Sequence, residues 1–150
     1  MAATLIIAEN PDQARAKGAE LLQPHTGDKA FIWVPPFGST PGHGPRLDGY
    51  QQHEEQVILG SRLAQLASWV DAVIAEGLNQ WAENLHLRYT GNKDKIESER
   101  VSLIAVLDTG MAELVLITRR PASASPEGAP GVLTRTIEAL RAKVEHVVEL

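Results

Sequence analysis

Hydrophobic and polar positions along the chain predict short strands that alternate with amphipathic helices. Residues 4–8 and 30–34 are short apolar runs, each typical of a buried strand. Between them, Asn10 suits a helix N-cap and Pro11 suits the first helical position, so we expect a helix that ends near Pro24. This first part of the chain is therefore predicted to form a strand–helix–strand unit with parallel strands.

The longest helical pattern extends from residue 51 to residue 81. Its apolar residues follow one another at spacings of four and three, and further apolar positions widen the hydrophobic face; the regular stripe is Leu59, Leu63, Leu66, Val70 and Val73. A helix with so wide an apolar face is covered on more than one side, either within the domain or by a second subunit. The second alternative predicts a homo-oligomer that associates through residues 57–81.

The second half of the chain contains two more apolar runs, residues 101–107 and 112–118. They are joined at hairpin length and are apolar at nearly every position, which predicts an antiparallel hairpin in the centre of the sheet. A short strand is expected at residues 85–89. Residues 119–131 are rich in Pro, Ala, Ser and Gly and predict a mobile segment, and periodic apolar residues then predict a final helix over residues 132–150.

These elements predict an α/β or α+β fold in a single domain, residues 1–150. We expect a mixed sheet of four to five strands, with a parallel βαβ start, a late antiparallel hairpin and about three helices packed on it. A chain of 150 residues is long enough to bury a core of its own.

Composition narrows the classes of function. A net charge of −5 argues against a general affinity for nucleic acid, and the absence of cysteine excludes disulfides and thiolate metal sites. No apolar stretch reaches the ~20 residues that span a bilayer, and the N-terminus lacks the features of a signal peptide. We therefore expect a soluble, cytoplasmic protein without a membrane partner.

An irregular stretch, residues 35–52, separates the second expected strand from the long helix. It is rich in proline and glycine, and loops of this length in compact domains are usually functional or disordered. It also follows the expected end of a strand, where ligands bind in open α/β sheets. These residues are therefore the strongest candidate for a functional surface, including contact with a protein partner.

Several polar residues of this stretch have chemistry to offer. Gly42 and Gly44 would let backbone N–H groups approach an anion, and Arg46 would pair with a phosphate or carboxylate. The glycine spacing matches neither the phosphate loop nor the dinucleotide fingerprint. Anion binding is therefore one interpretation of these residues, and a connection that its prolines merely stiffen is the alternative; no cofactor is assigned.

Acid–base chemistry has three weak candidates in the same region: His43, Asp48 and His53. Two imidazoles and a carboxylate also resemble a metal-ligand set, but Val57 stands where the metalloprotease helix motif needs its second histidine. No metal site is predicted.

A basic patch follows from the expected hairpin. If the chain turns at Thr109 and Gly110, Arg100 lies opposite Arg119 and close to Arg120, which would suit a phosphate. Acidic residues are interspersed among these arginines, so solvated strand ends are the alternative interpretation.

One triplet in the predicted turn resembles a known active site. Asp108-Thr109-Gly110, preceded by apolar residues, is similar to the active-site triplet of retroviral-type aspartic proteases. The further strands, glycine-rich flap and downstream apolar-glycine motif of those enzymes are missing, so a hairpin turn accounts for the triplet.

Two hypotheses for function remain. The first is a self-associating binding or assembly module that presents the Pro/Gly-rich loop to a partner. The alternative is an enzyme or ligand-binding domain for a phosphorylated or nucleotide-like small molecule, using residues 38–53. The sequence favours the first because none of its motifs has the surroundings that catalysis requires, and whether the protein is an enzyme stays open.

Overall fold

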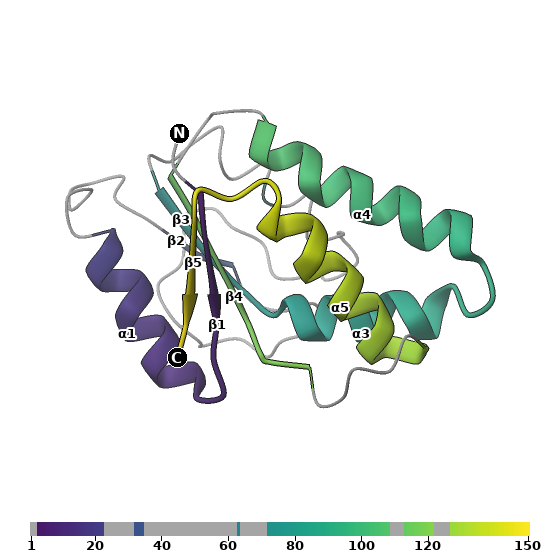
Figure 1. Ribbon diagram of the computed structural model, residues 1–150, viewed down its shortest axis with the longest axis horizontal. Coiled ribbons are helices and arrows are strands. Elements are labelled where there is room, and N and C mark those ends of the chain that lie inside the picture. The colour runs from purple at the N-terminus through teal and green to yellow at the C-terminus, as the bar shows by residue number, and fades with distance from the viewer. Residues whose placement is uncertain (1–2, 23–31, 35–62, 64–71, 109–112, 122–126) are drawn as a thin grey trace.

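The computed structural model describes residues 3–22, 32–34, 63, 72–108, 113–121 and 127–150. Within them, a parallel β-sheet carries helices on both faces (Figure 1). The strands are β1 (Ala3–Ile7), β2 (Ile32–Val34), β3 (Ala72–Glu76), β4 (Glu113–Thr118) and β5 (His146–Glu149). The helices are α1 (Pro11–Leu21), α3 (Leu78–Arg88), α4 (Lys93–Asp108) and α5 (Gly128–Arg141).

The sheet has the strand order β2-β3-β4-β1-β5, and every neighbouring pair of described strands is parallel. The first strand is internal, because Leu5 is in register with Leu116 of β4 and with Val147 of β5. The predicted α/β class is confirmed, and the mixed sheet is wrong for the strands described. β1 and β2 do run parallel, as expected, but β3 and β4 lie between them.

The strands separate two hydrophobic layers. Alternate side chains of β1 point to opposite faces: Leu5 and Ile7 pack with α3, α4 and α5, whereas Ile6 and Ala8 pack with α1. Figure 1 shows the same division, with α1 on one side of the sheet and the other three helices opposite. The nearly continuous apolar runs of the sequence are explained by this burial on both faces.

Helix α1 begins as the sequence predicts. The Asn10 side-chain oxygen accepts hydrogen bonds from the backbone N–H groups of Asp12, at 2.9 Å, and Gln13, at 3.3 Å, and Pro11 is the first helical residue. Further along, a Cβ added to Gly18 would lie 3.4 Å from the Val115 Cγ1 atom of β4. Glycine at this position therefore lets the helix pack closely on the sheet.

The predicted hairpin is wrong. Residues 101–107 belong to α4, which buries Leu103, Val106 and Leu107 and exposes Val101, a burial pattern with the three- and four-residue spacing of a helix. The second apolar run is a strand, β4, as expected, but its neighbours β1 and β3 are parallel to it. A short apolar run does not by itself distinguish a strand from a buried helix. Here the length of the whole element distinguishes them, because α4 begins eight residues before the apolar run.

The predicted long helix is also wrong for residues 72–77, whereas residues 78–81 are helical as expected and belong to α3. Residues 72–76 are the buried strand β3, and Gly77 then adopts a left-handed conformation with φ of 101° before α3 begins. Leu63 is helical and buried, and the remaining residues of the predicted helix lie outside the described ranges. Its apolar residues in β3 are therefore covered by the protein's own layers and are not available to a second subunit.

Three smaller expectations need correction. The strand expected at 85–89 is part of α3, apart from its last residue, and the final helix ends at Arg141 and is followed by β5. Residues 128–131 of the predicted mobile segment form the first turn of α5, and residues 122–126 lie outside the described ranges. Among the described helices, none combines the length and the hydrophobicity that a bilayer span requires.

Candidate ligand site at the carboxyl edge of the sheet

The topology creates a crevice between β1 and β4. The chain leaves β1 toward α1 on one face of the sheet and leaves β4 toward α5 on the opposite face. Where neighbouring parallel strands send their connections to opposite faces, a crevice opens beyond their carboxyl ends, and ligands of open α/β sheets bind in such crevices.

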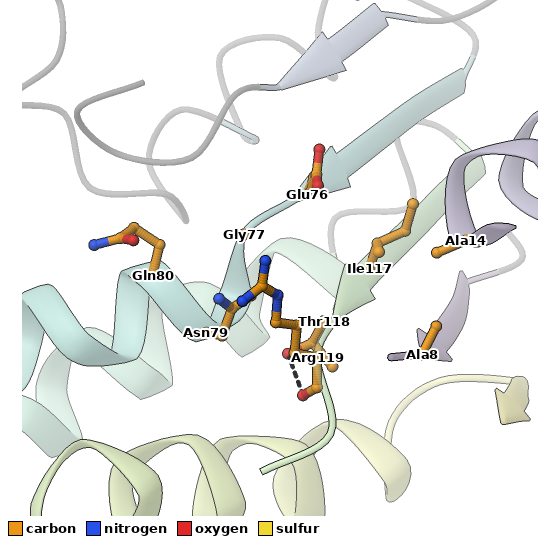
Figure 2. A pocket seen from close by; sticks show the side chains of 9 residues that line it. All are labelled: Ala8, Ala14, Glu76, Gly77, Asn79, Gln80, Ile117, Thr118 and Arg119. Carbon is orange, nitrogen blue, oxygen red and sulfur yellow. Dashed lines mark hydrogen bonds between the residues drawn. The ribbon is translucent and has the colours of Figure 1, made fainter. Parts of the chain in front are cut away.

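A cavity of 180 Å³ lies at this edge (Figure 2). The described residues that line it are Ala8, Ala14, Glu76, Gly77, Asn79, Gln80, Ile117, Thr118 and Arg119. They come from the ends of β1, β3 and β4 and from the first turns of α1 and α3. The volume equals that of about six molecules of liquid water at roughly 30 Å³ each. The cavity therefore has room for a small ligand of a few carbon atoms.

A tight turn at Gly77 brings the start of α3 to the cavity. The Gly77 N–H donates to the Ile117 carbonyl oxygen of β4 at 3.3 Å, and its φ of 101° reverses the chain at once into the helix. Among the residues that the structure describes, no side chain caps this helix start. The backbone N–H groups of the first helical turn give this wall a partial positive charge.

An ion pair fixes the carboxylate at the end of β3. Arg15 of α1 donates through Nε to Glu76 Oε2 at 3.2 Å, and through Nη2 to Oε1 at 3.1 Å and to Oε2 at 3.0 Å. Arg15 Nη1 also pairs with Asp12 Oδ1 at 3.0 Å. The Glu76 side chain is only 14% exposed, so the pair both orients this carboxylate and compensates its charge at the cavity wall.

Arg119 supplies a cation of a different kind. It follows β4 directly, its carbonyl oxygen accepts a hydrogen bond from Thr118 Oγ1 at 3.2 Å, and Figure 2 shows its side chain extended toward the start of α3. Within the described part of the chain, its guanidinium has neither an ion pair nor a hydrogen bond. None of the described residues therefore occupies the five N–H donors of this group.

The candidates of the Pro/Gly-rich stretch lie outside the described residues; they are Gly42, His43, Gly44, Arg46, Asp48 and His53. Strand β2 ends at Val34, which is in register with Ala75 of β3. The chain therefore enters residue 35 at the same edge of the sheet as the cavity. This agrees with the expectation that the stretch follows the carboxyl end of a strand.

The structure divides the predicted basic patch. Arg119 and Arg120 follow β4 at the carboxyl edge, but Arg100 is a buried residue of α4. Its Nη1 atom pairs with Glu97, and its Nε atom donates to Thr136 Oγ1 of α5 at 3.2 Å. Because residues 101–107 are a helix, the strand pairing that placed Arg100 opposite Arg119 does not exist, and Arg100 instead joins two helices.

Four residues of the site are not predicted from the sequence. The helical spacing over residues 51–81 conceals the strand that ends at Glu76 and the turn before Asn79 and Gln80. Arg15 has no local signal, because only its contact with Glu76 brings it to the site. A usable signal was present, since a run of four buried apolar residues ends in Glu76-Gly77. A glycine directly after a short apolar run is typical of a strand that turns sharply.

Comparison with known proteins adds no assignment. No protein-family model matches the chain, and no curated protein sequence matches it either. Among the described residues, His, Asp and Glu side chains do not gather in groups of three or more that could hold a metal ion. The chemistry of the cavity walls is therefore the basis for assigning a function.

Proposed function

We propose that the protein binds a small phosphorylated molecule in the cavity at the carboxyl edge of the sheet. The observation that carries this proposal is the position of Arg119, whose guanidinium lines the cavity without an ion pair among the described residues. Arginine is well suited to this role because its planar fork donates two parallel hydrogen bonds to a phosphate.

The start of α3 supports the same class of ligand. Among the described residues, no side chain caps this helix start, and Asn79 and Gln80 of its first turn line the cavity. Because the Arg119 side chain extends toward the same helix start (Figure 2), its guanidinium and the backbone N–H groups together favour a group that bears several acceptor oxygens and negative charge. Glu76, the one carboxylate among the described lining residues, is ion-paired with Arg15 and so opposes this preference less than a free carboxylate would.

This ligand class agrees with the second of the two functions predicted from the sequence, although the site is built from other residues. Participation of residues 38–53 and a cytoplasmic location stay predictions. The assembly hypothesis also stays a prediction, and it now depends on residues 35–52 and on the part of the predicted helix before residue 72. We propose binding and assign no reaction.

The test is calorimetric titration of the protein with n-propyl phosphate and with inorganic phosphate. Binding is expected, and Arg119→Ala should weaken it by about tenfold to a hundredfold, the usual effect of losing hydrogen bonds to a charged group. Arg120→Ala is the matched control, because Arg120 is the next residue, is exposed and is not among the lining residues. Absence of binding, or equal weakening by both substitutions, would overturn the proposal.

A further inference from the structure

We infer that the phosphorylated ligand carries hydroxyl groups within a few carbon atoms of its phosphate, and that Glu76 binds one of them. This inference rests on the proposed function and extends it to the class of ligand, a phosphorylated polyol of about three carbon atoms. The observations that carry it are the position, the remaining hydrogen-bond capacity and the compensated charge of the Glu76 carboxylate.

Glu76 keeps an acceptor for a ligand. An ionised carboxylate has about four lone-pair sites. Among the described residues, Oε2 accepts from both Nε and Nη2 of Arg15, whereas Oε1 accepts from Nη2 alone, which leaves Oε1 capacity for another donor. Glu76 is a lining residue of the cavity, and Arg15 holds its carboxylate in one orientation.

The ion pair between Arg15 and Glu76 favours a neutral hydrogen-bond donor on the ligand. Arg15 already compensates the negative charge of Glu76 with a bidentate ion pair. A ligand ammonium group would gain less from a carboxylate that is already ion-paired than from a free one, and it would lie close to the Arg15 guanidinium. A hydroxyl needs only an oriented acceptor, so the neutral donor fits this site better.

The sheet sets the distance between the Glu76 carboxylate and the Arg119 guanidinium. Glu76 is in register with Ile117 of β4, and Arg119 lies two residues beyond Ile117, directly after the end of that neighbouring strand. Neighbouring strands are about 4.8 Å apart, so the carboxylate and the guanidinium extend from backbone positions that lie close together. A cavity of 180 Å³ that both residues line leaves room for a short carbon chain between the phosphate and the hydroxyl.

The experiment compares two ligands that differ only in their hydroxyl groups. Titration with sn-glycerol 3-phosphate and with n-propyl phosphate is expected to give a Kd about tenfold lower for the glycerol compound, because a hydrogen bond to a charged group contributes about this factor. Glu76→Met, which removes the acceptor at similar length, should bring the two Kd values within about twofold of each other. The Kd of the Glu76→Met variant for n-propyl phosphate should stay close to that of the unmodified protein.

Each outcome decides the inference. Equal Kd values for the two compounds in the unmodified protein overturn it and leave the proposed function standing, whereas failure of both compounds to bind overturns the proposed function itself. Tighter binding of 3-aminopropyl phosphate than of sn-glycerol 3-phosphate overturns it in favour of an ammonium-bearing ligand. If Glu76→Met does not fold, as judged by circular dichroism, Glu76→Gln replaces it, and an undiminished preference for the glycerol compound in that variant counts against the inference.

Discussion

Arg15 on one face of the sheet holds Glu76 at the end of a strand 61 residues later, with hydrogen bonds of 3.0 to 3.2 Å to both carboxylate oxygens. The ion pair connects α1 to β3, which is not the strand that precedes α1 in the chain. It therefore holds together two walls of the cavity that come from distant parts of the sequence.

This ion pair should contribute measurably to stability. Glu76 is mostly buried but Arg15 is 40% exposed, so solvent screens the pair, and a coupling free energy of about 1 kcal/mol is expected. The measurement is a double-mutant cycle of Arg15→Met and Glu76→Gln in urea unfolding. Asp12→Asn is the control, since its carboxylate is 88% exposed and its loss should change the free energy of unfolding little. Additive effects of the two substitutions would show that the pair makes no net contribution.

Gly77→Ala should destabilise the protein by about 1 to 2 kcal/mol, because φ of 101° is strained for any residue with a Cβ atom. The same substitution should weaken phosphate binding, since the turn positions the start of α3. Urea unfolding and titration with n-propyl phosphate measure the two effects. Gly91→Asn, at another positive φ but with no atom near the added Cβ, is the control and should fold with nearly unchanged stability. Normal stability of Gly77→Ala would contradict this account of the turn.

Gly18→Ala should stabilise the protein, in contrast to Gly77→Ala. Alanine at this helical position would make ordinary contacts at 3.4 to 3.8 Å with side chains of the sheet, and removing the flexibility of glycine should stabilise the protein by about 0.5 to 1 kcal/mol. Gly18→Leu should instead cost about 1 to 3 kcal/mol, because the larger side chain would push α1 from the sheet. Thermal unfolding of both variants provides the check, and equal melting temperatures would refute close packing at this point.

Arg100→Ala should lower the free energy of unfolding by about 2 kcal/mol, because it removes a buried group that joins α4 to α5 through Thr136. Arg120→Ala is the matched control, since its side chain is exposed, and it should leave stability unchanged. If Arg100→Ala reduced the free energy of binding n-propyl phosphate by more than it reduced the free energy of unfolding, Arg100 would belong to a ligand site, as the sequence first suggested.

The sequence predicts those elements whose local signals agree with their tertiary environment. Asn10 and Pro11 mark the start of α1 correctly, and the apolar periodicity that predicts the final helix holds within α5, where Leu133, Ile137 and Leu140 are buried. Both predictions depend on contacts within a few residues, which the sequence contains directly.

Other elements could not be predicted because neighbours far along the chain decide them. Val73 fits a helical spacing with Val70, but its burial in the sheet depends on pairing with Leu114 and Ile32. Strand β5 has only a short and weak apolar pattern, and its conformation depends on β1, to which Leu150 N–H and Glu145 N–H donate at 2.9 Å. The cavity was missed for the same reason, since its residues are adjacent only after the sheet has formed.

The internal position of β1 also has a consequence for synthesis. Leu5 pairs with Leu116 and with Val147, so neither neighbour of this strand has left the ribosome when β1 emerges. Every residue of β1 is buried in the finished sheet, and this strand must therefore stay unpaired until β4 has been translated. Contacts between distant parts of a chain form slowly, and exposed strands of this kind are targets for aggregation and for chaperones. Fragments that end before β4 should therefore be insoluble, even though they contain the first strand and its helix.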